Sequence, residues 1–93
     1  MAGYEHDKQA LLKRLARIEG QVRGIARMVE DDRYCIEVLD QVSAITSGLQ
    51  KVSLVLVREH LDHCVAEAVR GDEDGGRAKL DEAAKAIERL VKS

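Results

Sequence analysis

Three side chains in this sequence have the types and spacing of a soft-metal site: Cys35, His60 and Cys64. His60 and Cys64 are 4 residues apart, which places them one turn apart on the same face of a helix. Two thiolates and one imidazole form a soft ligand set that suits Cu(I) or Zn(II). Because an isolated cysteine is more often a small buried apolar residue, the same three residues also fit a metal-free helical core.

The chain between Cys35 and His60 decides whether a single copy could build this site. The interval is 25 residues long, contains no proline, and keeps its apolar residues at helical spacing. A continuous helix would place Cys35 roughly 37 Å from His60, since each residue rises about 1.5 Å. We therefore expect Cys35 to meet His60 and Cys64 of a second copy. Two antiparallel helices would cross near Ser47-Gly48-Leu49, where small residues let backbones approach, and give two sites per dimer.

Length and composition limit the chain to one small helical domain. Its 93 residues, taken as a single domain over 1–93, include no Pro, Phe or Trp, and the apolar residues are mostly Leu, Val, Ile and Ala. A chain this short has a thin core when alone, which favours self-association. Two cysteines without a signal-like N-terminal run favour a reducing cytoplasm. The longest apolar stretch, Leu54–Val57, is far too short to span a membrane.

The apolar periodicity predicts an all-α protein. Three helices are expected, over Glu5–Glu30, Tyr34–Val69 and Arg77–Lys92. Asp31–Arg33 is predicted to be a polar turn, Gly71 a C-cap, and residues 72–76 a flexible acidic loop. The second helix carries two apolar stripes, so it needs more than one partner. One stripe can pack on the first helix, and the other is expected to meet another subunit.

The first predicted helix is strongly basic, although the whole chain has a net charge of −2. Between positions 8 and 27, one acid, Glu19, accompanies six basic residues: Lys8, Lys13, Arg14, Arg17, Arg23 and Arg27. Such a concentration of positive charge can mark a surface that binds a polyanion. A solvated helix face is the usual explanation for a single helix, so charge alone leaves both interpretations open.

Four segments together resemble the copper-sensing repressor family (CsoR/RcnR). They are Arg14–Ile25 with the sequence RLARIEGQVRGI, Tyr34-Cys35, Gln41–Ala44, and His60-Leu61-x-x-Cys64. The resemblance covers nearly the whole chain. It implies an all-helical protomer, a dimer built as an antiparallel four-helix bundle, and a dimer of dimers. The resulting homotetramer would bind operator DNA without a helix-turn-helix.

The resemblance also implies roles for individual residues. Cys35, His60 and Cys64 match the Cu(I) ligands of the copper sensors, and Tyr34 and Glu82 match residues that support those ligands. Residues linked to DNA binding match Arg14 and Lys51, and we add the neighbouring cations of the first helix, namely Lys13, Arg17 and Arg23.

The resulting prediction is a cytoplasmic, non-enzymatic, Cu(I)-responsive repressor that releases operator DNA when copper binds. Within the family, a sensor of nickel, cobalt, zinc or an electrophile is the main alternative, with His6 or His63 as a further ligand. Nickel and cobalt sensors of the family carry His where this chain has Cys64, which favours copper. An enzyme with Cys64 as nucleophile lacks a recognisable oxyanion hole. A helical assembly module with both cysteines in its core is the third alternative.

Overall fold

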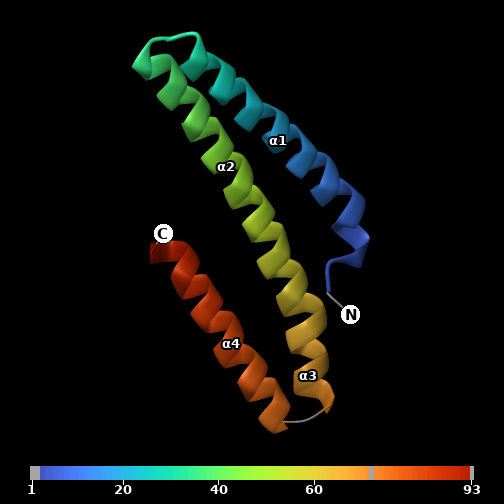
Figure 1. The fold of residues 1–93 in the computed structure, drawn as a ribbon. Coiled ribbons are helices and arrows are strands. Elements are labelled where there is room, and N and C mark those ends of the chain that lie inside the picture. The colour runs from blue at the N-terminus through green and yellow to red at the C-terminus, as the bar shows by residue number, and fades with distance from the viewer. Residues whose placement is uncertain (1–2, 72, 93) are drawn as a thin grey trace. The chain divides into compact units, whose positions relative to one another are not determined.

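A computed structural model describes residues 3–71 and 73–92, and the regular structure of these residues is entirely helical (Figure 1). The elements in chain order are η1 (Glu5–Asp7), α1 (Lys8–Glu30), α2 (Cys35–Glu59), the π-helical segment η2 (His60–Val65), α3 (Ala66–Gly71) and α4 (Glu73–Lys92). The all-α prediction is therefore confirmed. The chain forms two compact units, one over Asp7–Ser53 and one that combines the N-terminal residues with the chain from Leu54 onward.

The unit Asp7–Ser53 is a helical hairpin of α1 and the first part of α2. Its buried apolar side chains recur at helical spacing on both helices: Leu11 and Ile18 in α1, Ile45 and Val52 in α2. Gly48 faces α1, because a Cβ added there would lie 3.3 Å from Cδ1 of Ile18. The sequence assigned Gly48 to a crossing between subunits. In the structure its missing side chain makes room for Ile18 of the same protomer, and the crossing between subunits stays a prediction.

The predicted turn between the first two helices is confirmed and closes α1 with a Schellman motif. The Asp32 backbone lies in the left-handed region at φ 54°. The N–H of Arg33 donates to the carbonyl of Met28 at 2.9 Å, and the N–H of Asp32 donates to that of Val29 at 3.1 Å. The carbonyl of Tyr34 then accepts hydrogen bonds from the N–H groups of Glu37 and Val38 in the first turn of α2. These bonds place Cys35 at the N-terminal end of α2.

In the second unit, α3 and α4 pack closely around a glycine. A Cβ added at Gly76 would lie only 2.7 Å from Cα of Val69, so the two backbones touch there. The expected loop over residues 72–76 is wrong for its last four residues, because α4 already begins at Glu73; Asp72 lies outside the described residues. In the sequence the glycines suggested a flexible loop, whereas in the structure the missing side chain of Gly76 permits α3 and α4 to touch. Gly71 is the last residue of α3.

The long second helix is continuous in winding from Cys35 to Gly71 but is not uniform. Over His60–Val65 it widens into a π-helix, and the N–H of Ala66 reaches back to the carbonyls of Leu61 and His63. Short π-helical segments inside α-helices are rare and occur frequently at functional sites. Both His60 and Cys64 lie in this segment.

Large apolar side chains remain on the surface of every long helix. Among the described residues none is fully buried, and Val22, Leu39, Leu54 and Val91 are each at least half exposed. Exposed apolar surface of this extent marks a surface suited to protein contacts. Within the described residues, no helix combines the length and apolar character that crossing a membrane requires.

Candidate metal centre and nucleic-acid surface

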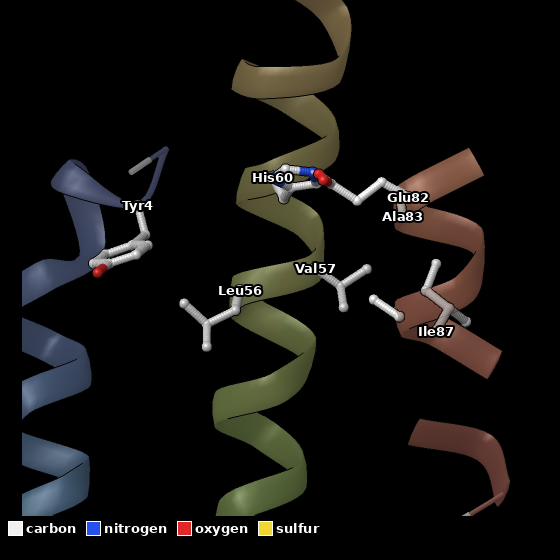
Figure 2. A pocket seen from close by; sticks show the side chains of 8 residues that line it. Tyr4, Leu56, Val57, His60, Glu82, Ala83 and Ile87 are labelled. Atoms are coloured by element: carbon white, nitrogen blue, oxygen red, sulfur yellow. The ribbon is translucent and has the colours of Figure 1, made fainter. Parts of the chain in front are cut away.

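The side chain of His60 faces α4. Its Nε2 atom lies 3.8 Å from Oε1 of Glu82, and Figure 2 shows Glu82 reaching from α4 toward the imidazole ring. The same carboxylate oxygen lies 3.7 Å from Nζ of Lys79. His60 and Glu82 line a cavity of about 320 Å³ together with Tyr4 and apolar side chains of α2 and α4. Glu82 is thus placed where it can orient the His60 ring through a short movement.

Cys64 lies in a different hollow of the same unit. This hollow, of about 540 Å³, is lined by both N-terminal and helical residues: Gly3, Glu5, His6, His63, Cys64, Glu67 and Lys79. The Cys64 residue is half-buried, and its thiol lies beside the backbone of Gly3. The structure therefore places His60 and Cys64 on one π-helical segment but along two separate cavities.

The two remaining histidines lie next to each other. The ring centroids of His6 and His63 are 5.5 Å apart, and Nε2 of His63 lies 3.0 Å from Oε2 of Glu59. This contact directs His63 toward its own helix turn and toward the N-terminal segment. Sequence spacing alone did not reveal the proximity of His6 to His63, because the two are more than fifty residues apart.

Cys35 is exposed and is the first residue of α2, while His60 directly follows the last residue of that helix. An α-helix of 25 residues, the length of α2, is about 37 Å long. Tyr34, beside Cys35, is 68% exposed. In the part of the chain that the structure describes, no group of three His, Cys, Asp or Glu side chains is arranged to hold a metal ion. Within one protomer, the structure does not bring Cys35 to the other two candidate ligands.

The basic residues of α1 form a shallow cationic hollow. Lys13, Arg14 and Arg17 line it together with Ala10. Arg23 differs from them, because its guanidinium is paired with Glu19 at 3.0 Å. Lys51, in α2, is exposed. Lysine and arginine side chains on one helix face can contact successive phosphates of nucleic acid, which positions a protein on DNA without reading its sequence.

Comparison with known proteins connects the candidate metal ligands with the basic surface of α1. The family model described as "metal-sensitive transcriptional repressor" matches residues 7–89. The copper-sensing transcriptional repressor RicR of Mycobacterium tuberculosis is 57% identical over 91 residues, which cover 98% of this chain and 95% of that protein. The copper-sensing repressor CsoR of Bacillus subtilis is 41% identical, with 94% of this chain and 84% of that protein covered.

Two solved structures share the fold. The Cu(I)-bound copper-sensing repressor CsoR of Geobacillus thermodenitrificans superposes with a TM-score of 0.85 at 45% identity, covering 92% of this chain and 88% of that one. The nickel-responsive transcriptional regulator InrS gives a TM-score of 0.73 at 36% identity, with 87% and 89% covered. The family model covers the whole unit Asp7–Ser53 and the other unit from Leu54 to residue 89, including the candidate ligands and the basic helix. The chain belongs to the metal-sensitive transcriptional repressor family.

Proposed function

We propose that this protein is a Cu(I)-responsive transcriptional repressor that binds operator DNA when metal-free and releases it when Cu(I) binds. The observation that carries the proposal is its likeness to a Cu(I)-bound repressor, with a TM-score of 0.85 at 45% identity. The 57% identity to a second copper-sensing repressor points the same way. The nickel-responsive relative is less similar in both sequence and structure, which favours copper over nickel.

We propose that Cys35 of one protomer and His60 and Cys64 of its partner hold the Cu(I) ion. The ligand chemistry fits, because two thiolates and an imidazole are soft donors, and three ligands suffice for Cu(I). The bounds of α2 support a shared site, since Cys35 begins this helix and His60 follows its end. When bound, Cu(I) would supply a bond between two subunits. Tyr34 and Glu82 would act on the ligands next to them, Cys35 and His60.

An assembly is part of the same proposal. The exposed apolar side chains of the helices would pair in an antiparallel dimer, and two dimers would form the homotetramer. The basic residues of α1, with Lys51, would contact the phosphates of operator DNA. Because its ligands are reduced thiols, we place the protein in the cytoplasm.

The direct test joins metal and DNA binding in one titration. Metal-free protein is used to select a duplex from a random DNA library, and fluorescence anisotropy then follows its binding under reducing conditions. Cu(I), delivered from a chelator of known affinity, should raise the Kd for the duplex by roughly 5–150-fold. Zn(II) and Ni(II) serve as controls. If either of these ions releases DNA while Cu(I) does not, the proposed metal is wrong.

The role of the basic helix is tested by Arg14→Ala. Loss of one phosphate contact should weaken binding to all duplexes alike and reduce the slope of log K against log[salt] by about 0.9. Arg23→Ala is the matched control on the same helix, and it should have a smaller effect because Glu19 already neutralises Arg23. Salt titrations of both variants provide the measurement. An unchanged salt slope for Arg14→Ala would remove Arg14 from the proposed interface.

A further inference from the structure

The N-terminal residues Gly3–His6, which we call the strap, lie against the segment that carries both candidate ligands. The strap belongs to the same compact unit as the chain from Leu54 onward, although more than fifty residues separate them in sequence. Its position follows from three contacts with the rest of the unit and one hydrogen bond within the strap.

The tightest contact joins Gly3 to Cys64. A Cβ added at Gly3 would lie 2.7 Å from Sγ of Cys64, 3.7 Å from the carbonyl oxygen of Glu59 and 4.0 Å from Cα of His60. Gly3 is itself buried and has a φ of 98°, a conformation that other residues rarely adopt. The strap therefore passes directly over the thiol, at a distance that only glycine allows.

The other strap residues fix this position. Tyr4 lines the cavity that His60 shares with α4, as Figure 2 shows. The carboxylate of Glu5 accepts a hydrogen bond from the N–H of Gly3 at 3.2 Å, which closes the strap on itself. The His6 ring lies 5.5 Å from that of His63. The strap thus has anchors beside both His60 and Cys64.

We propose that the strap is an inhibitory cover over Cys64, which must leave before this thiol can join a metal site shared between subunits. A cysteine from another chain must approach Cys64 to within a few ångströms, since zinc and similar ions bind sulfur at about 2.3 Å. The backbone of Gly3 occupies part of that space. The consequence for copper rests on the function proposed above, whereas the cover itself concerns the metal-free protein alone.

The strap leads directly along the chain into α1, the basic helix. The strap continues through Asp7 into α1, which begins at Lys8. Displacement of the strap by metal binding would therefore release the segment that precedes the proposed DNA-binding helix. This arrangement would contribute to the coupling of copper and DNA without any contact between the metal and α1.

The cover is tested by the reactivity of Cys64 in metal-free protein. In a Cys35→Ala background, the rate of alkylation by iodoacetamide reports Cys64 alone. Gly3→Ala should displace the strap and raise this rate on the order of 10-fold, the factor expected if the strap is closed in nine molecules of ten. Gly24→Ala is the matched control, because a Cβ added at Gly24 meets nothing within 4 Å. Its rate should equal that of the parent.

A second variant and a second measurement complete the test. Tyr4→Ala removes an anchor without crowding the thiol, so it should also raise the alkylation rate. With Cys35 intact, Gly3→Ala should bind Cu(I) more tightly by a similar factor. Unchanged alkylation in both strap variants would overturn the cover, whereas weaker Cu(I) binding by Gly3→Ala would overturn its consequence for copper. Since alkylation needs neither copper nor DNA, failure of the proposed function would leave this result standing.

Discussion

Mixed dimers should regain a copper site that neither parent variant possesses. Cys35→Ala protomers and protomers with both His60→Ala and Cys64→Ala each lack part of the ligand set in every homodimer. After the two are unfolded and refolded together, each heterodimer should contain one complete site. With random pairing of protomers, the mixture should bind roughly a quarter of the parent's Cu(I). The unmixed variants should lose tight binding, by more than the 10–100-fold typical of residues that only support a ligand.

The measurement is a Cu(I) titration against a competing chelator. Two batches of Cys35→Ala protein, refolded together in the same way, provide the control for the refolding step. If the mixture binds no more Cu(I) than this control, the ligands are not shared between protomers in this way. A site within one protomer would require α2 to unwind, because Cys35 begins this helix and His60 follows its end.

Glu82→Gln should uncouple copper from DNA. The carboxylate of Glu82 lies 3.8 Å from Nε2 of His60, and a metal-bound histidine usually donates its other ring N–H to such an acceptor. Glu82 would then transmit metal occupancy to α4. The variant should bind DNA normally when metal-free and change its Cu(I) affinity by about 10-fold or less. It should lose most of the coupling, which is about 1–3 kcal/mol in typical allosteric proteins.

Glu88→Gln is the control for this substitution. Glu88 lies on the same helix and forms an ion pair with Lys92 at 2.8 Å, away from His60. Anisotropy titrations with and without Cu(I) should show full release of DNA for Glu88→Gln and poor release for Glu82→Gln. Complete release by Glu82→Gln would leave the direct bond between subunits as the source of coupling.

Helical periodicity was sufficient to predict the fold, because apolar residues at spacings of three and four require helices that bury one face. The turn at Asp31–Arg33 was also predictable from its polar residues. The start of α4 was not, since Gly75 and Gly76 suggest a loop, and the sequence does not show the contact with Val69 that accounts for Gly76 in a helix. A glycine that allows close packing and a glycine that allows flexibility look identical in a sequence.

The candidate ligands followed from residue type and spacing, and they stay a prediction because the proposed site needs a second protomer. The π-helical winding of His60–Val65 was not predicted, because its residues keep the same apolar spacing as the α-helix around them. The position of the strap over Cys64 could not be predicted from the sequence either. It joins residues that are 61 positions apart in the chain through a backbone contact, and Gly3 carries no side chain that could indicate a partner.

Because the core is thin, the folded fraction of the protein is expected to depend on the protein concentration. No described side chain is fully buried, while Leu54 and Val91 are more than two-thirds exposed. If these side chains are covered only by association, then folding and assembly form one equilibrium governed by mass action. A tenfold dilution shifts each dimer dissociation by about 1.4 kcal/mol, a substantial part of the stability of a small domain. The abundance of the protein would then set how much of it is folded, in addition to how much DNA it can occupy.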